Sequence, residues 1–234
     1  MEGESVNPTV ETEQRPQFDA ILVHSFLISR IKDPSAEQEP FKGSLRSRLA
    51  ARAAALLYYE GLARNIVVVG GKVKGPSYPS TASVIMDELV NKYNVPKENI
   101  FMNEEEYNTE EEIGTLSKLS KEKGWSNVAS ISFRTHEKFV RDILSSVPRE
   151  IRTSFISIEG IINKYDDPVV QRLVKRLNSS KYQWEYKAYE GTKVFLRRKL
   201  PGVYRKMLKK NEQLRRTKNK SGELTLHGID VFKS

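Results

Sequence analysis

Two histidines of this chain stand where they could transfer a proton. His24 comes directly before Ser25, and His136 ends the tripeptide Arg134-Thr135-His136. Because an imidazole changes its charge near neutral pH and a carboxylate can tune it, His136 and Glu111 are the catalytic candidates. His24 and Ser25 are candidates for ligand binding, since neighbours in sequence do not make a catalytic triad. His24 is also typical of a histidine in a protein interior.

Short polar and flexible residues could bind a ligand closely. Gly70 and Gly71 would let the backbone approach a phosphate, although a glycine pair is equally typical of a tight turn. Asn108 and Thr109 would orient polar groups of the ligand, or the pair could instead cap a helix, with Thr109 as the expected cap residue.

Arginine side chains could supply positive charge. Arg134 and Thr135 open a predicted helix, where free N–H groups favour anions. A guanidinium makes charge-assisted hydrogen bonds to phosphate or carboxylate oxygens, so we expect Arg134 and Arg48 to contact the ligand. Arg46 and Arg52 share a predicted helix with Arg48 and are alternatives to it.

Strands and helices alternate along the sequence and would position these groups. Runs of apolar residues predict buried strands over 18–25, 66–69, 99–102, 128–133 and 154–158. Capping residues and helical spacing predict helices over 44–61, 80–95, 109–119 and 135–146, with further helices over 167–178 and about 199–216. The pattern predicts an α/β three-layer sandwich with a mainly parallel, Rossmann-like sheet of about five strands. The candidate groups that directly follow a strand should all lie at one edge of that sheet, because the carboxyl ends of parallel strands meet there.

Composition limits the classes of protein to which the chain can belong. It has 234 residues and no cysteine, which excludes disulfides and thiolate metal sites and fits the cytoplasm. Its longest apolar run is Ala53–Tyr59, far short of a membrane span. Three dispersed histidines indicate no metal site. We expect a disordered acidic leader over 1–17, a domain over 18–198 and a basic helical extension over 199–234.

Positive charge is concentrated near the end of the chain. The net charge is +9, and residues 193–220 hold twelve Lys and Arg with Glu212 as their single acidic residue. Such a segment attracts nucleic acid or other polyanions. It is also typical of the solvated face of a helix, and Phe195 and Tyr204 are its only aromatic residues, so base stacking has little support.

The ordered motifs over residues 18–145 resemble the YdcF/SanA/ElyC-like family. The resemblance is carried by the glycine pair, the step from Val95-Pro96 to Ile100, the motif Asn108-Thr109-x-Glu111, and Thr135 with His136. It implies a Rossmann-like fold with a polar pocket for a small, nucleotide-like or phosphate-bearing ligand. S-adenosylmethionine or another nucleotide-like compound is therefore a candidate cofactor.

Three functions are compatible with the sequence. The first is a domain that binds a small anionic ligand at the carboxyl ends of the strands, with or without an enzymatic reaction. The second is a nucleic-acid- or ribosome-associated protein that acts through residues 193–220. The third is a non-catalytic scaffold for other proteins.

Overall fold

A computed structural model describes most of the chain. The described residues are 16–26, 28–30, 41–75, 77–166, 168–178 and 182–210. The predicted leader therefore lies outside the described residues except for residues 16 and 17, and the predicted basic extension is described only as far as Lys210. Within the described part of the chain, every helix is too short or too polar to cross a membrane.

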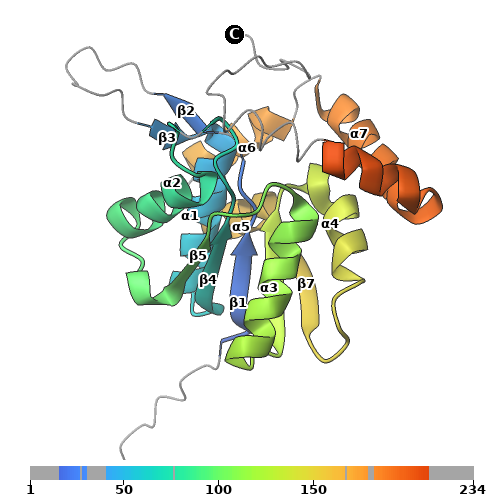
Figure 1. Ribbon diagram of the computed structural model, residues 1–234. Coiled ribbons are helices and arrows are strands. Elements are labelled where there is room, and N and C mark those ends of the chain that lie inside the picture. Colours follow the sequence, from blue (N-terminus) through green and yellow to red (C-terminus); the bar gives the residue numbers. More distant parts are fainter. Residues whose placement is uncertain are drawn as a thin grey trace, which may run out of the picture.

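Five parallel strands form the central sheet, as the sequence predicts. They are β1 (Phe18–Val23), β4 (Ala63–Val69), β5 (Ile100–Asn103), β6 (Asn127–Ser132) and β7 (Arg152–Ser157). Their order across the sheet is β5-β4-β1-β6-β7, and each neighbouring pair is parallel. The chain builds one side of the sheet outward from β1 and then returns to build the other side beside β1. The strand order therefore reverses between β1 and β6, with all carboxyl ends at one edge, the upper edge in Figure 1.

Helices cover both faces of the sheet. Alternate residues of β1 point to opposite faces, so Ile21 packs in one core and Leu22 in the other. The first core joins the sheet to α1 (Leu45–Tyr59), α2 (Thr81–Asp87), α5 (Ile158–Tyr165) and α6 (Pro168–Asn178). The second joins it to α3 (Thr109–Lys123), α4 (Glu137–Leu144) and α7 (Tyr182–Lys199), with α3 and α4 in front of the sheet in Figure 1. The predicted three-layer sandwich is confirmed.

Helix caps follow the sequence at two of three predicted positions. Ser44 caps α1 and Ser80 caps α2, each accepting a hydrogen bond from a first-turn N–H group. The prediction that Thr109 caps α3 is wrong, because Asn108 Oδ1 accepts from the N–H groups of Glu110 at 3.0 Å and Glu111 at 3.1 Å. Asn is a stronger cap than Thr. The Thr109 hydroxyl is therefore free for another contact.

Several elements are not predicted by the sequence. Short strands β2 (Ile28–Arg30) and β3 (Phe41–Gly43) pair in antiparallel fashion near the carboxyl edge. Helix α2 continues as a π-helical turn over Glu88–Lys92. Most important, α7 begins at Tyr182, well before the helix expected from about residue 199. A further helix covers residues 201–210, inside that predicted helix, after a break at Leu200.

Gly70 offers a test of the packing at the carboxyl edge. Its φ is +143°, and a Cβ there would overlap the hydroxyl oxygens of Ser25 and Thr81. We expect Gly70→Ala to lower the free energy of unfolding by about 2 kcal/mol or more. Gly114 is a matched control, because a Cβ there meets nothing within 4 Å on the exposed side of α3. Gly114→Ala should raise the free energy of unfolding by about 0.5–1 kcal/mol. Urea unfolding measures both variants, and equal effects of Gly70→Ala and Gly114→Ala would contradict the close packing around Gly70.

Candidate functional site

Two histidines meet where the strand order reverses. His24 follows the end of β1, and His136 ends the 3₁₀ turn Arg134–His136 that follows β6. Their rings lie 5.7 Å apart in an edge-to-face arrangement. In open α/β sheets this position, outside the carboxyl ends of the strands, is where ligands bind. These two predicted site residues are therefore close neighbours.

His24 links three elements of the protein. Its Nδ1 lies 2.5 Å from Oε2 of Glu112 on α3, and its Nε2 lies 2.7 Å from the Ser130 hydroxyl on β6. Ser25 donates a hydrogen bond of 3.2 Å to the other oxygen of Glu112. His24 is 2% exposed, so these contacts are made out of reach of water. An ionised carboxylate only accepts hydrogen bonds, so Nδ1 of His24 carries a proton.

His136 has a similar pair of partners. Its Nδ1 lies 3.0 Å from Oε2 of Glu190 on α7, and its Nε2 lies 3.2 Å from the Thr109 hydroxyl at the start of α3. The other oxygen of Glu190 lies 3.0 Å from Nζ of Lys193. Each buried histidine is thus held between a carboxylate and a hydroxyl group.

Burial sets the charges around His136. Desolvation lowers the pKa of the His136 imidazole, and the contact with Glu190 opposes this only in part. Burial raises the pKa of Glu190, but His136 and Lys193 together outweigh that effect and the net shift is downward. The arrangement is therefore a neutral imidazole beside an ionised carboxylate that Lys193 neutralises. Nε2 of the neutral His136 ring carries no proton, so its lone pair accepts a hydrogen bond from the Thr109 hydroxyl.

Two buried hydroxyl groups lie at the end of β6. Within the described structure, Ser132 Oγ and Thr135 Oγ1 have no hydrogen-bond partner. Ser132 is fully buried and Thr135 is 4% exposed. A buried hydroxyl without a partner costs about 1–3 kcal/mol. These two groups, next to His136 in the sequence, can pair with a bound molecule or water.

The predicted anion site at the start of the turn is occupied by the protein itself. The backbone N–H of Arg134 donates to both carboxylate oxygens of Glu159, at 3.0 and 3.1 Å. Glu159 is buried on α5, while the Arg134 side chain is exposed. The N–H group that was expected to meet a ligand is therefore paired internally.

The glycine pair packs against the protein rather than forming an open cradle. The N–H of Gly70 donates to the carbonyl of Asn103, and that of Gly71 donates to the carbonyl of Glu106. A Cβ on Gly71 would come within 2.9 Å of the Tyr107 ring. Both glycines thus let the segment after β5 pack closely against the backbone after β4. This agrees with the alternative that the glycine pair serves a turn rather than a phosphate.

Three other predicted residues have partners of their own. Arg48 lies 3.3 Å from Glu88, and Glu111 accepts a hydrogen bond of 2.7 Å from the N–H of Tyr107. Asn108 caps α3. Of the two alternatives to Arg48, Arg52 pairs with Asp166, while Arg46 lies over the ring of Phe133, directly after β6. Arg46 is therefore the arginine of α1 that contacts the end of β6.

Glu112, Ser130 and Glu190 are the members of the cluster that the sequence does not predict. Helical phase could have separated Glu112 from Glu111, because Glu112 lies four residues before buried Leu116. Glu190 likewise lies four residues before buried Val194. Ser130 faces the cluster from inside a predicted strand, where a serine is not conspicuous.

The fold and the cluster define a Rossmann-like α/β protein with a polar centre at the reversal point of the sheet. No protein-family model, curated protein sequence or solved structure matches the chain. The resemblance to the YdcF/SanA/ElyC-like family therefore depends on the sequence motifs.

Stability should depend on pH through His136. The folded state keeps this imidazole neutral, whereas the unfolded chain takes up a proton near the ordinary pKa of 6.5. The free energy of unfolding should therefore fall as the pH drops below that value. Between pH 7.5 and 5.5 we expect the wild type to lose about 1 kcal/mol more than His136→Asn. Urea unfolding at several pH values measures this, and equal losses in the two proteins would contradict the assigned charge.

Proposed function

We propose that this chain binds a small anionic, nucleotide-like ligand at the carboxyl ends of β1 and β6, as its resemblance to the YdcF/SanA/ElyC-like family suggests. The observation that carries the proposal is the meeting of His24 and His136 at the reversal point, with their rings 5.7 Å apart. Each ring is held by a carboxylate, which fixes its orientation before any ligand arrives. Such preorganised polar groups are typical of ligand sites.

Side chains around the histidines supply complementary chemistry. Thr109 is partly exposed and contacts Nε2 of His136, so a ligand group that binds the Thr109 hydroxyl would lie next to the unprotonated nitrogen. Ser132 and Thr135 offer hydroxyl groups that lack partners among the described residues. The guanidinium of Arg46, over Phe133, supplies positive charge at the same strand end. This set suits a ligand that carries both hydroxyl and anionic groups.

Helix α7 controls access to the imidazole in this proposal. Glu190 contacts His136 from above the carboxyl edge, and His136 is 6% exposed. A ligand therefore reaches Nε2 beside Thr109 or after a shift of α7. With Glu190 beside Nδ1, His136 acts as a proton acceptor at Nε2, and Glu190 is the carboxylate next to the imidazole in place of Glu111, the catalytic candidate of the sequence.

Ligand screening with a conservative variant tests the proposal. Calorimetry with S-adenosylmethionine, ATP and ADP should find at least one compound that binds the wild type. Thr109→Val keeps the shape of the side chain but removes its hydroxyl, so we expect affinity to fall about tenfold or more, or about 1.4 kcal/mol. Thr153→Val makes the same change in β7, away from the cluster, and should bind normally.

Two results would contradict the proposal. One is that none of the three compounds binds the full chain at millimolar concentration. The other is that Thr109→Val and Thr153→Val bind the compound equally well.

A further inference from the structure

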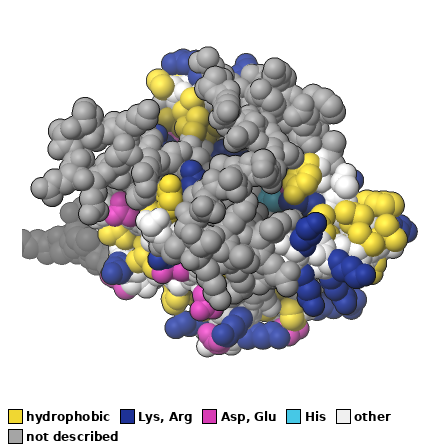
Figure 2. All heavy atoms as spheres, turned by 45° about the horizontal axis from the view of Figure 1, so that its top comes forward, with side chains coloured by type: hydrophobic (Ala, Val, Ile, Leu, Met, Phe, Trp, Pro, Cys, Tyr) yellow, Lys and Arg dark blue, Asp and Glu magenta, His cyan; other side chains and the backbone are white. Residues whose placement is uncertain are grey.

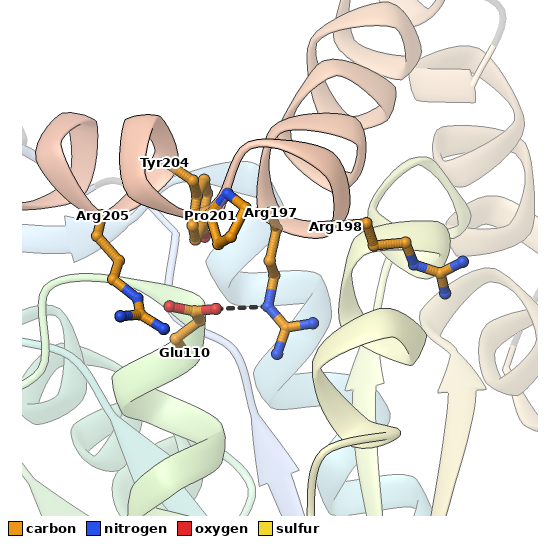
Figure 3. Close-up of a pocket in the computed structure, with 6 residues that line it drawn as sticks. All are labelled: Glu110, Arg197, Arg198, Pro201, Tyr204 and Arg205. Atoms are coloured by element: carbon orange, nitrogen blue, oxygen red, sulfur yellow. Dashed lines mark hydrogen bonds and ion pairs between the residues drawn. The ribbon is translucent and has the colours of Figure 1, made fainter.

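A separate hollow lies under the C-terminal helices. Its volume is about 430 Å³, within the range of about 300–1,000 Å³ that is typical of small-molecule sites. It is lined by Glu110, Arg197, Arg198, Pro201, Tyr204 and Arg205. Figure 3 shows Tyr204 and the arginines reaching from these helices, with Glu110 facing them from α3. None of these residues belongs to the histidine cluster.

Tyr204 lines this hollow and carries a hydroxyl group without a partner among the described residues. The residue is 2% exposed and its ring packs in the second core. Its hydroxyl is buried and, across the described chain, has no hydrogen-bond partner. Burial raises the pKa of Tyr204, so the hydroxyl keeps its proton and is available as a donor. A ligand oxygen would satisfy this group.

The arginines of the hollow differ in their availability. Arg197 is committed to the protein, with bonds of 2.6 Å to Glu110, 2.7 Å to Asp142 and 3.1 Å to Ser146. Arg198 is bonded to Asp142, and its side chain turns away from the other lining residues in Figure 3. Arg205 is exposed and has no ion-pair partner in the described part of the chain. It is therefore the cation that can bind a ligand.

The surroundings favour negative charge. Residues 193–210 contain eight Lys and Arg and no Asp or Glu. Figure 2 shows these basic side chains gathered over the C-terminal helices, at the right of the view. Glu110 is the only carboxylate among the lining residues, and its bond to Arg197 offsets its charge. An anion entering the hollow thus meets a net positive field.

We propose that this hollow binds a phosphate group, which accepts charge-assisted hydrogen bonds from Arg205 and a hydrogen bond from the Tyr204 hydroxyl. A phosphate has oxygens on several sides and can meet both donors at once, which suits a planar guanidinium. The phosphate could belong to a small phosphate ester or to the backbone of a nucleic acid. The inference does not rest on the proposed function of the histidine cluster.

Binding to two probes tests the proposal and separates the two sources. Calorimetry with pyrophosphate and with a single-stranded 12-nucleotide DNA at low salt should show binding of at least one probe to the full chain. We expect Arg205→Gln to weaken that binding at least tenfold and Tyr204→Phe to weaken it about fivefold. Glu110→Gln should strengthen it severalfold, because a negative charge beside the anion is removed.

Lys209→Gln is the matched control, because it removes a charge from the same helix outside the hollow. It should change pyrophosphate binding by less than about twofold. Binding of pyrophosphate that depends on Arg205 and Tyr204 identifies a site for small phosphate esters. Binding of the DNA alone, with the same dependence, identifies a nucleic-acid phosphate. The proposal is overturned if neither probe binds at millimolar concentration, or if Arg205→Gln and Lys209→Gln have equal effects.

Discussion

Two buried carboxylates, Glu112 and Glu190, need polar partners at the carboxyl edge of the sheet. A buried charge without a partner costs several kcal/mol, so each position is tolerable only with a specific neighbour. His24 supplies that neighbour for Glu112, and His136 together with Lys193 supplies it for Glu190. Because the partners come from β1, α3, the turn after β6 and α7, these contacts fix how the elements meet above the sheet.

The same contacts give the edge its chemical character. They orient two imidazoles with Nδ1 toward a carboxylate and Nε2 toward a hydroxyl. At His136 these contacts place the lone pair of Nε2 next to Thr109, at the partly exposed start of α3. Farther along α7, Arg197 pairs with Glu110 and Asp142 and so joins the helix to α3 and α4. Helix α7 thus contributes Glu190 to the histidine cluster, and Arg197 and Arg198 to the hollow under the C-terminal helices.

The sequence predicts the fold better than the site, and particular residues show why. The β-branched run Ile66-Val67-Val68-Val69 is typical of a buried strand, and Ser44 and Ser80 are strong helix caps, so local patterns suffice there. Which of two neighbouring glutamates reaches a histidine depends on the phase of the helix. Glu111 contacts the backbone of Tyr107, whereas Glu112, one residue later, contacts His24. Glu190 depends on α7, whose mixed aromatic and charged sequence has no regular apolar stripe. The partners of Glu112 and Glu190 are therefore set by contacts between segments that are distant in the sequence, which local patterns do not predict.

Nitrogen-15 NMR of the imidazoles tests the central claim most directly. The chain has three histidines, so each ring can be assigned with a single-site variant. Nitrogen chemical shifts report which ring nitrogen carries the proton. The 3.0 Å distance from His136 Nδ1 to Glu190 Oε2 predicts the Nδ1–H tautomer for neutral His136 at pH 7.5, and the contact with Glu112 predicts a protonated Nδ1 for His24. Observation of the Nε2–H tautomer in either ring would contradict the pairing with Glu190 or with Glu112.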